Sequence, residues 1–244
     1  EGDPDGGSTR VVTQNNYGPT FWVGKQANGS RFEPYWDKVG AVGHYDYGSL
    51  TMARTLGGDA NQVVGSGRKI LLGWIGGGSP ASQSLPRELS LSNDYELLQR
   101  FVPELEQLRI EEEDEDDTGS LQIEVLATFE WEEGQAPSET FGVSVMNGTQ
   151  LIGVNCSGTF EESPCMGFAG DSAMGPILPV ETNSVTVHII VDHQIIESIF
   201  NNRTAMVTYA TPSSETQTAV SLFGTTNLKS SSIQTWKLRD ANNL

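Results

Sequence analysis

Apolar and polar residues alternate one by one along much of this chain, and this period of two limits what it can fold into. The clearest run extends from Leu121 to Thr128. Successive side chains of a β-strand point to opposite faces of a sheet, so such alternation predicts strands with one buried face. Further runs of this kind lie at 140–146, 150–155, 185–192, 194–200, 205–210, 218–223 and 231–238. Regularly spaced strands with turn residues between them are typical of a β-sandwich, which we predict for 120–244.

The first hundred residues carry shorter apolar runs that are bounded by Gly, Pro, Asn or Asp. These runs lie at 21–25, 48–54, 69–75 and 88–91. They also predict strands. We therefore expect an all-β chain in which 1–100 belongs to a separate sheet-rich domain.

A linker is expected at 101–119, between the two domains. Residues 103–109 have the composition for a helical turn or two, and 111–117 are seven consecutive acidic residues. Like charges at this density repel one another and resist burial, which favours an exposed, mobile connector. Clustered carboxylates also suit Ca²⁺, but the run lacks the alternating spacing and the glycine of a calcium loop. We therefore predict no metal site and no cofactor.

The net charge restricts the partners of the chain. Lys and Arg total 14 against 32 Asp and Glu, which gives −18 at pH 7. Because no basic cluster can neutralise phosphate groups, neither nucleic acid nor an anionic membrane is expected to bind. No apolar run approaches the roughly 20 residues that span a bilayer, and no basic-then-apolar leader opens the sequence. We expect a soluble chain whose targeting peptide is removed or belongs to a longer precursor.

Two cysteines, Cys156 and Cys165, flank a short segment that contains Gly158, Ser163 and Pro164. A disulfide across this segment is plausible in an oxidising compartment, and a metal site is not expected because no His lies nearby.

Four Asn-x-Ser/Thr sequons point to the same kind of compartment. They begin at Asn28, Asn147, Asn155 and Asn202. Each is a candidate glycosylation site, although such tripeptides arise by chance in a chain rich in Asn, Ser and Thr. Together with the cysteines they favour a secreted, cell-wall or vacuolar protein.

Several motifs follow one another in a recognisable order. Tyr-Asp-Tyr-Gly begins at Tyr45, Lys-Ile-Leu-Leu-Gly-Trp-Ile at Lys69, and Gln-Ser-Leu-Pro-Arg-Glu-Leu at Gln83. Later motifs occupy 97–109, 190–200, 202–208, 222–224 and 233–238. In this order they resemble the invertases, the β-fructofuranosidases of glycoside hydrolase family 32, from the late propeller onward.

This resemblance implies the last blade or blades of a five-bladed β-propeller, followed by a C-terminal β-sandwich. The family's chemistry is retaining hydrolysis or transfer of a β-fructofuranosyl group, by two carboxylates about 5 to 5.5 Å apart. Those carboxylates lie upstream of the Tyr-Asp-Tyr-Gly motif, and here only 44 residues precede Tyr45. The family's Arg-Asp-Pro and Glu-Cys-Pro triplets are both missing from the sequence. We therefore predict no catalytic residue in this chain.

Four acidic residues are candidates to replace the missing pair. Asp3 lies in Gly-Asp-Pro-Asp-Gly, which has the shape of the family's nucleophile motif, Asn-Asp-Pro-Asn-Gly, but also of an ordinary exposed turn. Glu33 is a candidate acid/base, but a surface position fits it better. Asp192 and Glu197 flank a predicted hairpin, where structural roles are the better interpretation.

The resemblance places Tyr45, Asp46 and Tyr47 on a blade segment that approaches the sugar-binding funnel. An aromatic ring can stack on a sugar face, and a carboxylate can accept hydrogen bonds from hydroxyl groups. These three are the candidate substrate-binding residues. The alternative, left open here, is that the tyrosines pack between blades and Asp46 caps a turn.

Three further residues have expected positions in the fold. Trp74 lies in an apolar strand and is expected in the core. Arg87 is expected to anchor its strand through an ion pair. His44 is expected to be solvated at a strand end.

The sequence leaves two classes of function open. The first is the C-terminal chain of a sucrose- or fructan-hydrolysing β-fructofuranosidase, completed by a companion N-terminal catalytic chain. The second is a non-catalytic carbohydrate-binding or scaffold protein, which includes an oligomerisation subunit. Isolated blades expose unpaired strand edges and apolar surface, which favours the first hypothesis.

Overall fold

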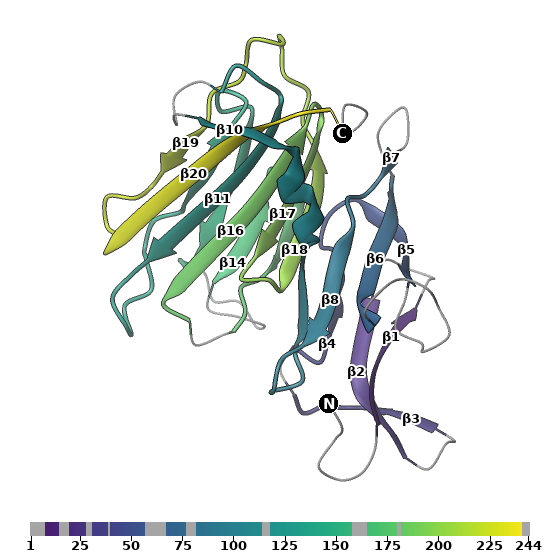
Figure 1. The fold of residues 1–244 in the computed structure, drawn as a ribbon. Helices are drawn as coiled ribbons and strands as arrows, with labels where there is room; N and C mark the ends of the chain where they lie inside the picture. Colours follow the sequence, from purple (N-terminus) through teal and green to yellow (C-terminus); the bar gives the residue numbers. More distant parts are fainter. Residues whose placement is uncertain are drawn as a thin grey trace. The chain divides into compact units, whose positions relative to one another are not determined.

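The computed structural model describes most of the chain. The described residues are 8–14, 20–27, 31–38, 40–56, 67–76, 82–113, 118–157, 165–179 and 182–240. Their strands form four antiparallel sheets, and the helical structure among them is the 3₁₀ helix η2 (Pro103–Leu108) (Figure 1). The predicted all-β class is confirmed. Nothing helical in this described part is long and apolar enough to cross a membrane.

The chain divides into two compact units. The first contains Glu1–Asp46 and Leu50–Phe101, and the second contains Tyr47–Ser49 and Val102–Leu244. The Tyr-Asp-Tyr-Gly motif is therefore divided between the two units after Asp46.

The first sheet of the first unit is built around a long central strand. Its strands are β1 (Ser8–Gln14), β2 (Thr20–Ala27), β3 (Arg31–Pro34) and β4 (Val42–His44). β2 pairs with β1 along one edge, and with both β3 and β4. Phe21, Val23 and Ala41 are buried and supply apolar surface to the core of this unit.

The second sheet of the first unit has the order β5-β6-β8-β9, with β7 paired to β6. Its strands are β5 (Leu50–Leu56), β6 (Lys69–Ile75), β7 (Ser82–Gln83), β8 (Arg87–Leu91) and β9 (Leu97–Phe101). Along β6, Leu71 and Ile75 are fully buried while Trp74 is 53% exposed. Successive side chains of a strand point to opposite faces of the sheet. One face of this sheet is therefore buried at β6, and the other is exposed at Trp74.

The second unit contains a six-stranded sheet, in the order β10-β20-β11-β16-β17-β18. Its strands are β10 (Arg109–Glu113), β11 (Gln122–Glu130), β16 (Ser184–Asp192), β17 (Ile195–Phe200), β18 (Thr204–Tyr209) and β20 (Ser230–Leu238). The segment Tyr47–Ser49 extends it beside β18, since the N–H groups of Tyr47 and Ser49 donate to the carbonyls of Ala205 and Val207 at 2.8 Å each.

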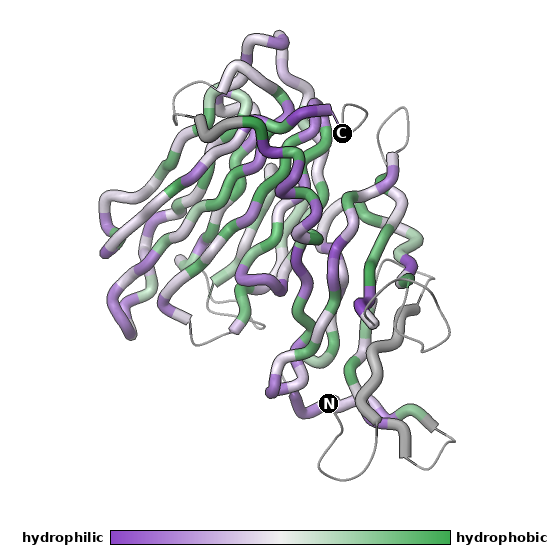
Figure 2. Tube along the Cα trace, in the orientation of Figure 1, coloured by the Kyte–Doolittle hydropathy of each residue, from purple (hydrophilic) through white to green (hydrophobic). Residues whose placement is uncertain are grey.

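A five-stranded sheet, in the order β15-β14-β13-β12-β19, completes the second unit. Its strands are β12 (Phe141–Val145), β13 (Gln150–Asn155), β14 (Met166–Ala169), β15 (Ala173–Pro176) and β19 (Ser221–Phe223). Both sheets contribute buried residues to a single hydrophobic cluster, for example Val125 and Ile189 from one and Val143 and Ile152 from the other. Figure 2 shows apolar and hydrophilic positions interleaved along these strands, which is the predicted period of two.

The region expected to be a linker differs in part from that expectation. Within 101–119, Arg109–Glu113 form strand β10 and pair with β20. The first three residues of the acidic run, Glu111 to Glu113, are therefore part of a sheet. Residues 114–117 of that run lie outside the described residues.

The number of sheets does not match that of a five-bladed propeller, of which the resemblance implied the last blade or blades. The described strands form four sheets, two in each unit. The path β5-β6-β8-β9 of the five-stranded sheet in the first unit has the four strands of a typical propeller blade.

Candidate functional site

Asp46 and Arg87 form a buried ion pair in the first unit. Arg87 Nη2 donates to Asp46 Oδ2 at 3.0 Å, and both side chains are at most 1% exposed. The second guanidinium nitrogen, Nη1, donates to the Tyr45 carbonyl at 3.3 Å and lies 3.5 Å from Gln99 Oε1. The ion pair expected for Arg87 is thus present, and it connects the start of β8 to the segment between β4 and β5.

Tyr45 is completely buried beside this pair. Its ring centroid lies 5.4 Å from that of Phe21, and its hydroxyl has no hydrogen-bond partner within the described part of the chain. Burial raises the pKa of Tyr45 well above its ordinary value, so the phenol is neutral. A fully buried ring with a neutral hydroxyl is a packing element.

Tyr47 and Gly48 belong to the second unit, where they lie against strands of its sheets. The Tyr47 ring packs over Gly175, since a Cβ built on that glycine would come within 2.6 Å of Tyr47 Cγ. A Cβ built on Gly48 would overlap the carbonyl oxygen of Val207. The glycine of the motif is therefore required by close backbone approach to β18.

These positions bear directly on the substrate-binding expectation for Tyr45, Asp46 and Tyr47. Tyr45 and Asp46 are 0% and 2% exposed, so neither can touch a sugar in this conformation. Adding further protein to the chain can only cover more surface, and it would not expose them. The geometry favours the packing alternative, with Asp46 as the anion of a structural ion pair.

Trp74, His44 and Glu33 lie at the surface. Trp74 is 53% exposed, so the expectation of a core position was wrong. It lies on the opposite face of β6 from Leu71 and Ile75, and an apolar run alone does not show which face is covered. His44, at the end of β4, and Glu33, in β3, are both exposed.

The acidic candidates are dispersed. Asp3 lies outside the described residues. Asp192 Oδ1 accepts a 3.1 Å hydrogen bond from Gln122 Nε2 and lies 2.8 Å from His193 Nδ1, at the exposed turn after β16. Glu197 is 1% exposed in β17. Among the residues that the structure describes, no group of three or more His, Cys, Asp or Glu side chains is placed to hold a metal ion.

A charged cluster that sequence reasoning missed surrounds Glu124 in the second unit. Arg109 donates to both carboxylate oxygens at 2.7 Å each, and His188 Nε2 lies 2.6 Å from Oε1. The guanidinium carbon of Arg109 also lies 4.0 Å from the centroid of the Trp236 ring. Burial raises the pKa of Glu124, but the hydrogen bonds from Arg109 and His188 outweigh this effect and lower it to about 2. The cluster ties together four neighbouring strands, β10, β20, β11 and β16.

The cysteines and sequons lie mainly in the second unit. Cys156 and Cys165 are joined by a disulfide. Asn147 and Asn202 are exposed in turns, while Asn155 is partly buried at the end of β13 and accepts hydrogen bonds from the Ser157 N–H and hydroxyl at 2.9 and 2.7 Å. Asn28 lies outside the described residues.

Comparison with solved structures finds proteins of the same fold at low sequence identity. Fructan 1-exohydrolase IIa from Cichorium intybus has a TM-score of 0.68 at 17% identity, over 97% of this chain and 58% of that chain. Exo-inulinase from Aspergillus awamori has a TM-score of 0.68 at 18% identity, over 91% and 50%. Sucrose-6-phosphate hydrolase from Lactobacillus gasseri has a TM-score of 0.64 at 14% identity, over 96% and 53%. This chain therefore spans between half and three fifths of the length of these structures.

Comparison at the level of sequence gives the family. No curated protein sequence matches the chain. The profile "Glycosyl hydrolases family 32 C terminal" matches residues 97–237, which is more than half of the 244 residues. The chain belongs to glycosyl hydrolase family 32, through the family's C-terminal domain.

Proposed function

We propose that this chain is the C-terminal part of a retaining β-fructofuranosidase that hydrolyses sucrose or a fructan. Its first unit would be the last blade or blades of the β-propeller, and its second unit the C-terminal β-sandwich. Family membership and the likeness to a fructan exohydrolase and an exo-inulinase support this proposal. The nucleophile and the acid/base would lie on a companion chain or on a preceding part of the same protein.

The observation that carries this proposal is an apolar face of the second sheet of the first unit. Trp74 and Leu56 on this face are 53% and 47% exposed. Trp74 pairs with Thr51, and Leu56 pairs with the partly buried Ile70, so they occupy one face across β5 and β6. Exposed apolar patches of this kind mark surfaces that a partner covers. We infer that the catalytic part of the enzyme packs on this face.

The role of the residues in this chain would then be structural. Asp46, Arg87 and Tyr45 stabilise the first unit from within. They would hold the blade that carries the Trp74 face in a fixed geometry for its neighbour. Precise support of this kind matters because small displacements of catalytic groups lower reaction rates steeply.

The disulfide Cys156–Cys165 supports an oxidising compartment for the protein. A secreted, cell-wall or vacuolar location follows as part of the proposal. Glycosylation at Asn147 and Asn202, whose side chains are exposed, is compatible with it.

The test is association measured by co-purification and size-exclusion chromatography of the protein as isolated. Trp74→Asp introduces a charge into the proposed contact, and Met174→Asp is a matched control, since Met174 is 54% exposed in the second unit. We expect Trp74→Asp to weaken association with the catalytic part by more than about tenfold, because burying an unpaired charge is costly. Met174→Asp should change it less than about twofold. Equal effects of the two variants on association with a companion catalytic chain would contradict the proposed contact at Trp74.

The alternative, a carbohydrate-binding protein without catalysis, predicts a different outcome. The chain would then be alone and monodisperse, and it would bind sugar without turnover. Neither Trp74→Asp nor Met174→Asp would change its elution volume.

A further inference from the structure

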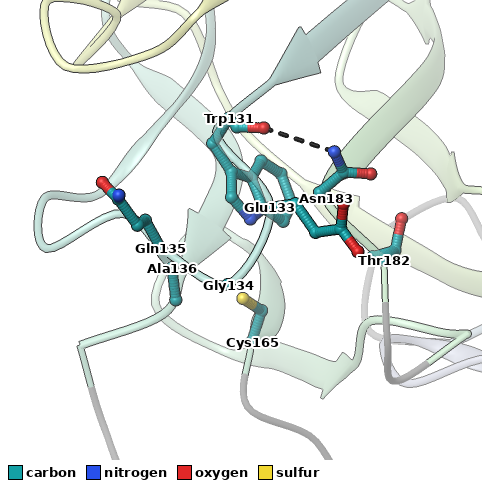
Figure 3. A pocket seen from close by; sticks show the side chains of 8 residues that line it. All are labelled: Trp131, Glu133, Gly134, Gln135, Ala136, Cys165, Thr182 and Asn183. Atoms are coloured by element: carbon teal, nitrogen blue, oxygen red, sulfur yellow. Dashed lines mark hydrogen bonds between the residues drawn. The ribbon is translucent and has the colours of Figure 1, made fainter.

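The surface hollow of the second unit is lined by polar and core residues rather than by exposed apolar ones. It has a volume of about 440 Å³, lies beside the end of β11, and includes Trp131, Glu133 and Asn183 in its lining (Figure 3). Trp131 is 4% exposed and belongs to the hydrophobic core, so its ring offers no face to a partner. Exposed apolar surface of this unit lies on one of its sheets instead.

The five-stranded sheet of the second unit contains no charged residue in its strands. β12, β13, β14, β15 and β19 consist only of apolar residues, Gly, Pro, Ser, Asn and Gln. The six-stranded sheet, by contrast, carries Arg109, Glu124 and Lys237 among other charged residues. The chain as a whole has 14 basic and 32 acidic residues, so the lack of charge sets this sheet apart.

One face of the five-stranded sheet packs into the core, and the other is its outer face. Ile152 and Val154 of β13 are fully buried in the core cluster, so their neighbours Leu151 and Gly153 point to the outer face. Residues directly opposite one another in neighbouring strands share a face. Ser144 of β12 is opposite Leu151 and therefore also lies on the outer face.

Apolar side chains cover much of this outer face. Phe168 of β14 is opposite Gly153, and a Cβ built on Gly153 would come within 3.0 Å of Cζ of both Phe168 and Phe223. Both rings are partly exposed, and Leu151 on the central strand β13 is 40% exposed. Met174, 54% exposed, extends the apolar surface to the edge strand β15. It lies at the rim, where an added charge would stay hydrated.

The composition of this outer face is that of an interface between proteins. The buried centres of such interfaces are depleted in charged residues and enriched in aromatic residues and Met. Exposed apolar patches on a folded domain mark surfaces of this kind. Burial against a partner is therefore the expected state of Leu151, Phe168 and Phe223.

The lack of charge indicates which partner fits. A two-fold symmetric dimer brings the same surface of two copies together, so that surface has to be complementary to itself. A charged surface would face its own charges, and the net charge of −18 opposes contact between copies elsewhere. An uncharged apolar sheet avoids this repulsion. We propose that two copies of this chain associate through the outer face of the five-stranded sheet, with sheet packed on sheet.

The test is sedimentation equilibrium of the full chain, with native mass spectrometry to count its copies in each particle. We expect two copies and a dissociation constant on the order of micromolar or tighter. Leu151→Asp and Ser144→Asp each place a charge in the contact and should weaken self-association by more than about tenfold. Ile110→Asp is the matched control, because Ile110 is 52% exposed in β10 of the other sheet. The Tm of each variant, compared with that of the wild type, shows whether it is folded.

The salt dependence is a second measurement that needs no substitution. Salt screens the repulsion between two copies of like charge, so the dimer should hold or tighten as NaCl is raised to about 1 M. Dissociation of the dimer by salt would instead show a contact between opposite charges, and would overturn the assignment to an uncharged face.

The number of copies is informative whether or not a catalytic chain is also bound, so this result is separate from the proposed enzymatic function. Two copies in the wild type and in Ile110→Asp, with one copy in folded Leu151→Asp or Ser144→Asp, supports the dimer. One copy of the wild type at about 50 µM would overturn it, as would a dimer that both substitutions leave intact. A single copy with a glycan on Asn155, which is opposite Met166 beside this face, would assign the face to the glycan instead.

Discussion

Asp46 Oδ2 and Arg87 Nη2 are 3.0 Å apart and belong to residues 41 positions apart in the sequence. Both side chains are excluded from solvent. A buried pair of this kind fixes the relative position of two segments, because separating the charges would leave each one without compensation. In this chain the two segments are the one that leads into β5 and the start of β8.

Replacing one partner of this ion pair should destabilise the protein strongly. We expect Asp46→Asn and Arg87→Met each to lower the free energy of unfolding by about 3 to 5 kcal/mol, since each leaves a buried group unpaired. The double variant should lose less than the sum of the two single variants. Urea denaturation measures all three.

A surface pair provides the control for this prediction. Arg100 Nη2 lies 3.1 Å from Glu88 Oε2, and its side chain is 61% exposed. Arg100→Met should therefore lower the free energy of unfolding by less than about 1 kcal/mol. If Asp46→Asn costs no more than Arg100→Met, the structural role of the buried pair is excluded.

Tyr45→Phe separates packing from substrate binding. The Tyr45 hydroxyl is buried without a partner among the described residues, and an unsatisfied buried group costs about 1 to 3 kcal/mol. We expect the variant to be as stable as the wild type or more stable, by up to about 1 kcal/mol, with unchanged sucrose KM in the complete enzyme. A rise in KM without loss of thermal stability would restore Tyr45 as a substrate contact.

Gly48→Ala tests the close contact between the Tyr-Asp-Tyr-Gly motif and β18. An added methyl group would overlap the Val207 carbonyl oxygen, and overpacking of this kind costs about 1 to 3 kcal/mol. We expect a lower Tm and faster amide exchange at Ser49, whose N–H donates to that carbonyl. Gly134→Ala is a control, because a Cβ there would meet no atom within 4 Å, although its positive φ of 74° adds some strain.

Protonation of Glu124 should lower the free energy of unfolding in the acidic pH range. Its pKa in the folded protein is about 2, below the ordinary value of 4.5, so the folded state favours the ionised form. The resulting stability is complete above pH 4.5 and is lost as the pH falls toward 2. At about 1.36 kcal/mol per pKa unit, the contribution is about 3 kcal/mol.

The measurement is urea denaturation of the wild type and of Glu124→Gln at pH 2.5 and pH 5.5. Other carboxylates titrate in both proteins, so the informative quantity is the difference between them. We expect the variant to be less stable at pH 5.5 and to lose less stability on acidification. Identical pH profiles would exclude the role assigned to the Arg109–Glu124–His188 cluster.

The sequence predicted the strands well and their long-range contacts poorly, for a physical reason. The alternation from Leu121 to Thr128 reports which side chains share a face, and Ile123, Val125 and Ala127 are indeed buried. The same pattern assigns Glu124 to the other face but does not reveal that this face is covered. Arg109 and His188 reach Glu124 from other strands, and one-dimensional patterns carry no information on strand order.

The candidate site shows the same limit. Tyr45 and Asp46 were found from their motif, but their burial depends on Phe21 and Arg87, which are distant in sequence. Conversely, Trp74 looked like a core residue because its strand is apolar, yet it is 53% exposed, and the apolar pattern of a strand does not show which of its faces is covered.

The central claim is that the catalytic carboxylates lie outside this chain while the chain is part of a β-fructofuranosidase. Denaturing mass spectrometry of the protein as isolated, with a sucrose-hydrolysis assay of the same sample, tests it most directly. We predict release of glucose together with a second polypeptide, or an intact mass above 26.4 kDa, that carries the missing Asn-Asp-Pro and Glu-Cys-Pro motifs. A single monodisperse chain of 26.4 kDa without sucrose hydrolysis would contradict the claim.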